Sequence, residues 1–168
     1  MSNSLTKDSY VDLANTPSIK SEFNVAMLNP LSSDLSVMRQ SLLFNGLEAV
    51  RLNQNHGSDS VKLFEFGKIY QKFESGFSES SQLALFLSGK KTEELWNSGT
   101  SDVSFFTLKG MVDSLLNKAG GGRYKASPTK NDLLEDGLAY KIEKKKVVDF
   151  GWIRADLKKE FGLNNDVF

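Results

Sequence analysis

Residues 28–43 read Leu28-Asn29-Pro30-Leu31-Ser32-Ser33-Asp34-Leu35-Ser36-Val37-Met38-Arg39-Gln40-Ser41-Leu42-Leu43. They predict a proline-bearing polar loop, then a short apolar strand and then a helix. The strand carries one arginine, Arg39. An arginine in such a place either faces a phosphate or carboxylate of a ligand or pairs with an acid of the chain itself, for example Glu65. The sequence leaves both interpretations open, and we favour the structural one.

The helix that follows has a clear apolar face. Ser41 is a suitable N-cap, and Leu43, Leu47 and Val50 recur at helical spacing, which predicts that they point into the core. Gly46 lies inside this helix, where glycine costs about 1 kcal/mol relative to alanine. We therefore expect that Gly46 permits a close approach of another element. The helix is expected to end near residues 56–57, His56-Gly57.

The remainder of the chain alternates between strand and helix patterns. Residues 61–70 are apolar on both faces and predict a central strand, and residues 74–81 predict a hairpin loop. Further strands are predicted at residues 2–6, 23–27, 82–88, 137–142 and 147–153, and further helices at 6–14, 105–116 and 155–161. This order predicts an α+β fold, with helices packed on one face of a mainly antiparallel sheet.

The composition is that of an ordinary globular domain. The chain has 168 residues, of which 39% are hydrophobic and 25% charged. It has no cysteine, which excludes disulfides, thiolate metal sites and cysteine nucleophiles. Its 21 basic and 21 acidic side chains give no net charge, which argues against a free-standing RNA-binding module. No apolar run reaches membrane-spanning length and no signal peptide is visible, so we expect a cytoplasmic protein without membrane contact.

Residue types that often carry chemistry are weak candidates here. His56 is the only histidine, so a catalytic triad or a histidine metal cluster gains no support. Residues 120–122 are three glycines before Arg123, but they follow a predicted helix, whereas a phosphate-binding loop precedes one. Residues 144–146 are three lysines that could touch an RNA phosphate, and we favour a solvated hairpin tip instead.

Several segments, in the same order along the chain, resemble the β subunit of bacterial phenylalanyl-tRNA synthetase. The segments are residues 29–33, 36–43, 63–70, 105–110 and 151–153. The residues that we take as structural signatures of the family are Asn29, Pro30, Met38, Arg39, Phe64, Glu65, Gly67, Lys109 and Gly110. The resemblance implies a class II aminoacyl-tRNA synthetase-like fold, in which an antiparallel sheet is flanked by helices. It places this chain in the catalytic-like but non-catalytic module of that subunit.

The resemblance also implies that two parts of an active class II core are missing. Residues 62–70 align with the strand that leads to an ATP-binding arginine, and Gln71 stands in the place of that arginine. A neutral amide cannot make the charge-assisted bidentate contact that a phosphate requires. The glycine-rich third motif with its arginine is not found before Phe168. We therefore expect no catalytic, cofactor-binding or metal-binding residue in this chain, and ATP and Mg to serve only the whole enzyme.

On this resemblance, residues 1–168 form a single module of the β subunit, a fragment without the upstream domains and without the C-terminal anticodon-binding domain. Its expected role is to dock and support the catalytic α subunit of a heterotetrameric phenylalanine–tRNA ligase, and to meet phenylalanine tRNA through the whole enzyme. The fragment alone is expected to be inactive, with its partner-facing apolar residues near the strand at residues 2–6. The alternative is a self-sufficient ATP-using ligase or nucleotide-binding class II-like core, which an ATP titration would reveal.

Overall fold

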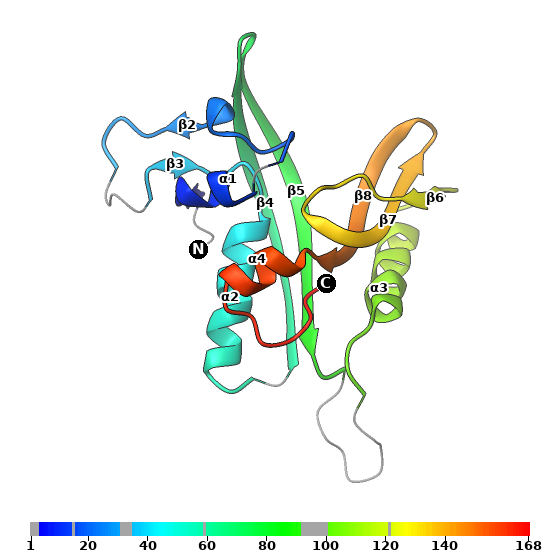
Figure 1. The fold of residues 1–168 in the computed structure, drawn as a ribbon. Helices are drawn as coiled ribbons and strands as arrows, with labels where there is room; N and C mark the ends of the chain where they lie inside the picture. Colours follow the sequence, from blue (N-terminus) through cyan, green and yellow to red (C-terminus); the bar gives the residue numbers. More distant parts are fainter. Residues whose placement is uncertain (1–3, 15, 31–34, 59, 92–100, 121) are drawn as a thin grey trace. The chain divides into compact units, whose positions relative to one another are not determined.

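The computed structural model describes residues 4–14, 16–30, 35–58, 60–91, 101–120 and 122–168 (Figure 1). In chain order the elements are β1 (Leu5–Thr6), α1 (Ser9–Ala14), a 3-10 helix (Ser21–Phe23), β2 (Val25–Ala26), β3 (Val37–Met38), α2 (Leu43–Asn55), β4 (Ser60–Phe73), β5 (Gly76–Gly89), α3 (Phe105–Lys118), β6 (Lys125–Pro128), β7 (Leu134–Ile142), β8 (Lys145–Ile153) and α4 (Ala155–Glu160). They form two compact units. The first unit comprises Met1–Leu52 and Leu63–Phe86, and the second comprises Asn53–Lys62 and Leu87–Phe168.

In the first unit, β3 lies between β1 and β2 in a small antiparallel sheet. The strand predicted at residues 23–27 is shorter than expected, because Phe23 closes a 3-10 turn and only Val25–Ala26 pairs with β3. Alternation of apolar and polar residues is also compatible with such a turn, which is why the pattern misplaced Phe23.

Helix α2 supplies much of the core of the first unit. The predicted inward positions Leu47 and Val50 are confirmed, because both side chains are fully buried. Leu43 is only half-buried, whereas its neighbour Phe44 is 1% exposed. The ring of Phe44 lies 5.6 Å from that of Tyr10 in α1, so α1 covers a part of α2 that the predicted face left out.

Gly46 of α2 permits the close approach that the sequence predicts. A Cβ atom at this position would lie 2.0 Å from Cζ of Phe86 on β5 and within 2.5 Å of two more atoms of that ring. Phe86 is itself 3% exposed, so the ring has little space in which to move aside. The helix ends as expected, with Gly57 in the left-handed region at a φ of 79°.

Strands β4 and β5 form a long hairpin, drawn in green in Figure 1. The predicted loop at residues 74–81 is wrong, because only Glu74 and Ser75 separate the two strands. Backbone pairing does not need apolar side chains, so the polar residues after the turn continue β5. The prediction that residues 61–70 form a central strand is also wrong, because among the described residues β4 pairs with β5 in a two-stranded sheet, and Phe64 and Phe66 are 77% and 72% exposed.

The second unit contains a three-stranded antiparallel sheet in the order β6-β7-β8. The predicted hairpin between β7 and β8 is confirmed, but the prediction that residues 144–146 form its tip is wrong in part: the turn is Glu143 and Lys144, and Lys145 and Lys146 belong to β8. Glu143 has a φ of 55°. Strand β6 was not predicted. Helix α3 packs on this sheet through Phe105, whose ring stacks 4.9 Å from the ring of Trp152. The α+β class with antiparallel pairing is therefore confirmed.

The carboxyl-terminal residues of the second unit pair with β5. Leu87 and Phe168 exchange two backbone hydrogen bonds of 3.1 and 3.0 Å, and Val167 forms a bridge to Ser88. Both Val167 and Phe168 are buried. The last residues of the chain therefore contribute to the core of this unit. Within the described part of the chain, no helix is long and apolar enough to cross a membrane.

Two helical glycines give a matched test of this packing. Gly46→Ala should lower the free energy of unfolding by about 1–2 kcal/mol, because overpacking near the top of its usual range of about 1–3 kcal/mol outweighs a helix-propensity gain of about 1 kcal/mol. Gly110→Ala in α3 should instead raise stability by about 0.5–1 kcal/mol, since outside its chain neighbours and its own helix backbone no atom lies within 4 Å of the added Cβ. Urea unfolding of both variants measures the difference. Equal stabilisation by the two changes would contradict the close contact of Gly46 with Phe86.

Candidate functional site

Arg39, directly after β3, is buried with 1% of its surface exposed. Its Nη1 donates to Oε1 of Glu65 at 2.5 Å, and its Nε donates to the carbonyl of Lys68 at 2.9 Å. The predicted pairing of Arg39 with Glu65 is therefore confirmed. The backbone of Arg39 also accepts a 2.9 Å hydrogen bond from the N–H of Tyr70. Both the side chain and the main chain of Arg39 thus bind to β4.

Gly67 makes room for this arginine. Glu65 and Gly67 are two residues apart on β4, so they face the same side of the strand. A Cβ atom on Gly67 would lie 2.2 Å from Nη2 of Arg39. Three of the predicted signature residues therefore meet at one place, and the guanidinium is directed to the chain itself.

The other signature residues do not join this cluster. Met38 is half-buried in β3, while Asn29 and Pro30 are exposed in the loop before it. Phe64 faces away from Arg39, on the exposed side of β4. A further pair belongs to the second unit, where α3 carries Lys109 and Gly110.

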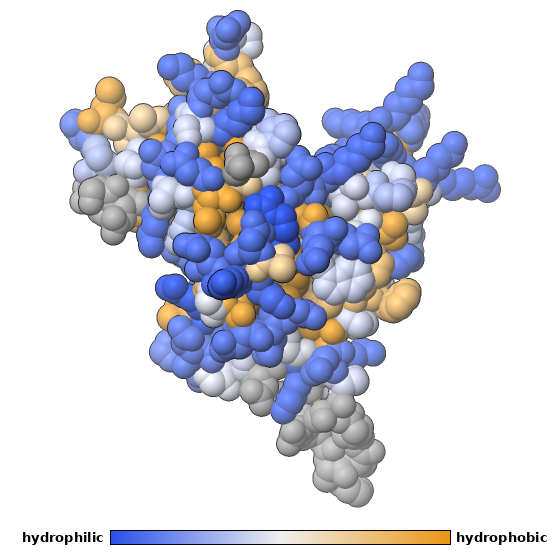
Figure 2. Space-filling model, viewed as in Figure 1, coloured by the Kyte–Doolittle hydropathy of each residue, from blue (hydrophilic) through white to orange (hydrophobic). Residues whose placement is uncertain are grey.

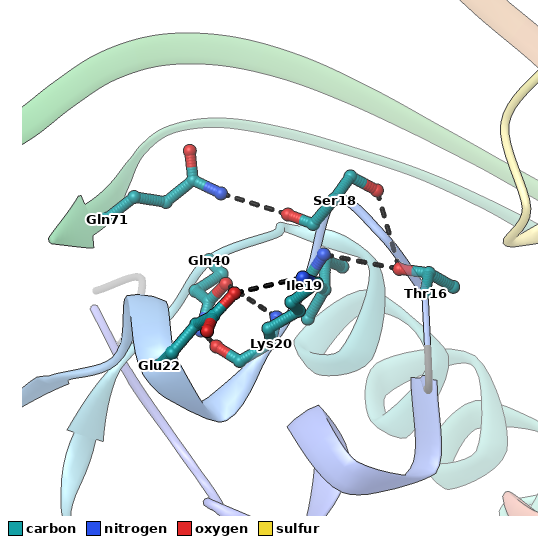
Figure 3. Close-up of polar contacts among 7 residues, drawn as sticks. All are labelled: Thr16, Ser18, Ile19, Lys20, Glu22, Gln40 and Gln71. Carbon is teal, nitrogen blue, oxygen red and sulfur yellow. Dashed lines mark hydrogen bonds and ion pairs between the residues drawn. The ribbon is translucent and has the colours of Figure 1, made fainter. Parts of the chain in front are cut away.

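Gln71, the residue that replaces an ATP-binding arginine in the resemblance, is also engaged within the chain. Its Nε2 donates to the carbonyl of Ser18 at 3.0 Å (Figure 3). Ser18 lies in a tight turn, in which the N–H of Ile19 donates to Oγ1 of Thr16 at 3.2 Å. A second glutamine, Gln40, makes hydrogen bonds to the backbone of Lys20, which directly follows Ile19, as Figure 3 also shows.

The contacts of Gln40 are reciprocal. Its Nε2 donates to the carbonyl of Lys20 at 2.8 Å, and its Oε1 accepts from the N–H of Lys20 at 3.3 Å. Two neutral amides, those of Gln40 and Gln71, therefore fix residues 18–20 against the strands. This arrangement supplies hydrogen bonds to a backbone, and it offers no positive charge to a phosphate.

The second unit contains a polar cluster around Asp113 that no sequence pattern predicts. Asp113 of α3 accepts hydrogen bonds from the hydroxyls of Tyr124 and Tyr140 at 2.8 and 2.9 Å, both at Oδ1. Its Oδ2 accepts from Nζ of Lys109 at 2.7 Å. The two tyrosine rings stack with their centroids 4.4 Å apart. The helical spacing of Lys109 and Asp113 was visible in the sequence, but the distant tyrosines gave no signal.

The electrostatics of this cluster favour a fixed charge pattern. Burial alone would raise the pKa of Asp113, but the hydrogen bonds from Lys109, Tyr124 and Tyr140 outweigh it and lower this pKa. Burial, followed by the bond to Asp113, raises the pKa of Tyr140, and the pKa of Tyr124 is raised chiefly by its own bond to Asp113. A carboxylate kept ionised and phenols kept protonated do not exchange protons near neutral pH, so the cluster acts as a clamp.

Metal ligands do not gather in the described residues. Among them, no group of three or more histidine, cysteine, aspartate or glutamate side chains could hold a metal ion.

Comparison with known proteins gives a consistent result. The family model described as "Phenylalanyl tRNA synthetase beta chain CLM domain" matches residues 1–168. The phenylalanine–tRNA ligase beta subunit of Bacteroides thetaiotaomicron is 32% identical over 180 residues, covering 100% of this chain and 22% of that protein. The beta subunit of Vibrio cholerae is 34% identical over 142 residues, covering 81% of this chain and 18% of that protein. The chain thus spans about a fifth of the length of these curated relatives.

Solved structures agree on the fold. The crystal structure of pyrrolysyl-tRNA synthetase from Desulfitobacterium hafniense matches with a TM-score of 0.72 and 16% identity, covering 99% of this chain and 57% of that one. A second structure of a pyrrolysyl-tRNA synthetase from that organism matches with a TM-score of 0.73 and 13% identity, again over 99% of this chain and 56% of the other. At these identities the likeness concerns the fold, and it confirms the class II synthetase-like architecture.

Removal of the buried arginine tests the structural role of Arg39. Arg39→Met should lower the free energy of unfolding by about 3 kcal/mol or more, because it leaves the carboxylate of Glu65 without its buried partner. Lys68→Met on the same strand is the control, since its ion pair with Glu79 is about half exposed and should contribute little to stability. Urea unfolding measures both. A smaller loss for Arg39→Met than for Lys68→Met would contradict the structural role.

The pH dependence of the clamp follows from its pKa shifts. Asp113→Asn should destabilise the chain by about 1 kcal/mol at pH 7, where the wild-type carboxylate receives three charge-strengthened hydrogen bonds. Because the folded pKa of Asp113 is depressed, this contribution is present above its ordinary value of 3.8 and is lost as the pH falls below it. Unfolding of both proteins between pH 7 and pH 2 should show the difference in stability shrinking toward acid. A difference that stays constant over this range would contradict the ionised clamp.

Proposed function

The chain belongs to the family of the phenylalanyl-tRNA synthetase beta chain CLM domain, and from this premise we propose that it is a non-catalytic core module of a phenylalanine–tRNA ligase beta subunit. In the proposed enzyme, the module docks and supports the catalytic alpha subunit during attachment of phenylalanine to its tRNA in the cytoplasm. ATP and Mg serve the whole enzyme, and this chain contributes no residue that holds them.

The absence of a catalytic role is supported by how the polar residues are used. Arg39 is committed to Glu65 and to a backbone carbonyl. Gln71 is committed to the backbone of Ser18. Adenylate formation requires preorganised positive charge at the phosphates. In the described part of the first unit, these residues direct their hydrogen bonds inward.

The docking role rests on one observation, the exposed aromatic face of the β4–β5 hairpin. Phe64 and Phe66 are 77% and 72% exposed and, being two residues apart on β4, they face the same side. Phe77 on β5 is 76% exposed. Clustered exposed aromatic side chains are typical of protein–protein interfaces, so we define Phe64 and Phe66 as the aromatic face and place the alpha subunit there.

The resemblance places the expected docking surface near the strand at residues 2–6 instead. Of that strand, Leu5 is half-buried and Thr6 is 3% exposed, so neither offers a large apolar surface. We therefore propose the aromatic face as the main contact.

A paired substitution tests this docking surface. The variant with Phe64→Ser and Phe66→Ser should lose at least about tenfold in affinity for the alpha subunit, because buried aromatic anchors dominate binding energy at interfaces. Phe106→Ser on α3 is the matched control, since Phe106 is 78% exposed, and it should bind as the wild type does. Sedimentation of each chain with purified alpha subunit measures the affinity.

A loss of affinity in these variants should not result from unfolding of the chain. All three side chains are exposed, so urea unfolding should show no large loss of stability. Unchanged affinity in the double variant, or an equal loss with Phe106→Ser, would show that the aromatic face does not dock the alpha subunit.

A further inference from the structure

Three lysines lie side by side across the sheet of the second unit. Lys125 of β6 pairs directly with Lys141 of β7, and Lys141 pairs directly with Lys146 of β8. Paired residues on adjacent strands point to the same face, and adjacent strands lie about 4.8 Å apart. The register of β7 and β8 shifts by one residue between Tyr140 and Lys141, so the pair of Lys141 with Lys146 lies next to this irregularity. All three residues are exposed. We call Lys125, Lys141 and Lys146 the lysine row.

Such a row is unfavourable for the folded chain by itself. Like charges directly opposite each other in a sheet are destabilising. Lys146 is partly compensated, because its Nζ lies 2.5 Å from Oδ2 of Asp149. Within the described residues, Lys125 and Lys141 make no ion pair. The central position of the row therefore has a cation on both sides and no acid of its own.

The surroundings strengthen the positive charge. Residues 123–125 and 141–149 together carry six basic and two acidic side chains, although the whole chain has no net charge. Arg123 precedes the row, Lys144 lies at the hairpin turn and Lys145 begins β8 directly after it; this turn is a hydrophilic projection in Figure 2. The positive charge is thus concentrated at one end of this sheet, where it forms a local electrostatic attraction for a polyanion.

We propose that the lysine row binds the phosphate backbone of RNA, an inference that rests on the proposed role in a tRNA ligase. Lysine ammonium groups are point charges, which suit a series of phosphates. Base recognition would need aromatic or amide groups beside the lysines, but Tyr140 points to the face of β7 opposite Lys141, where its ring stacks on that of Tyr124 at 4.4 Å. The row therefore contributes affinity that does not depend on RNA sequence.

A membrane surface fits the same site less well. Interfacial binding needs large apolar side chains beside the cations. In the described part of β6, β7 and β8, Val147 is the one large hydrophobic residue that is exposed, at 42%. RNA is therefore the polyanion to which the row is assigned.

The experiment uses the assembled enzyme that contains the full-length beta subunit. The row variant carries Lys125→Gln, Lys141→Gln and Lys146→Gln. The control variant also loses three positive charges, through Lys20→Gln, Lys68→Gln and Lys158→Gln, whose lysines are at least partly exposed and ion-paired. Binding of a phenylalanine tRNA transcript is measured by filter retention at several salt concentrations.

The row variant should bind the transcript at least about tenfold more weakly, and the slope of log K against log salt should fall by about 2, since each lost phosphate contact removes about 0.7–0.9. The control variant should keep both values within about twofold. The loss should be equal for a tRNA of another specificity. An unchanged row variant, or an equal loss in the control, overturns the proposal.

Two further measurements distinguish RNA binding by the lysine row from a structural role and from binding of another polyanion. Lys141→Gln should weaken RNA binding without lowering thermal stability, because it relieves repulsion within the row. A loss of stability would indicate a structural role and count against the proposal. Poly-glutamate and anionic vesicles serve as competitors, and competition as strong as that of RNA would overturn the assignment to RNA.

The proposed function can fail independently. RNA binding by the full-length beta subunit alone, with the same loss in the row variant, would support the lysine row even if that subunit did not assemble with the alpha subunit. Conversely, the row variant could assemble with the alpha subunit and bind RNA as the wild type does. This result would retain the proposed function and contradict RNA binding by the lysine row.

Discussion

A charged side chain that is 99% removed from water can persist only with a complete set of partners, and Arg39 imposes this requirement on the first unit. Its guanidinium needs the carboxylate of Glu65 and the carbonyl of Lys68, and it also needs the space that Gly67 leaves open. These three residues lie within a span of four residues of β4, 65–68. The pair therefore fixes how the segment after β3 meets β4, because a shift of one residue would turn Glu65 to the opposite face.

This constraint explains the long approach that precedes α2. The loop and the short strand β3 deliver Arg39 to β4, and helix α2 begins four residues later. Gln40, the next residue, holds the backbone of Lys20, while Gln71 at the far end of β4 holds Ser18. The side-chain amides of Gln40 and Gln71 therefore already donate hydrogen bonds within the chain, to the backbone carbonyls of Lys20 and Ser18. Such a closed arrangement stabilises a scaffold, whereas a phosphate-binding site needs positive charge that is not already paired.

The sequence predicted those features that depend on local periodicity. Leu47, Val50 and the glycine at position 46 were placed correctly because helical spacing states which residues share a face. The exposed side of β4 was not predicted, since a continuous apolar run has the same pattern whether a second face is covered by the chain or left open. The Asp113 cluster depends on tyrosines 11 and 27 residues further along the chain, and no local pattern connects groups at such distances. Arg39 and Glu65 were paired correctly because an isolated arginine in an apolar strand needs an acid.

The Asp113 clamp and the exposed lysine row meet at two consecutive residues of β7 in the second unit. Tyr140 and Lys141 are consecutive residues of β7, so their side chains point to opposite faces of the sheet. Tyr140 points toward α3 and is held by Asp113, which fixes the position of the strand just before the turn. Lys141 is then displayed on the other face between two further lysines, in a register that repulsion would otherwise disfavour. The energy that stabilises this register comes from the inner face, and the charge that it presents to a partner lies on the outer one.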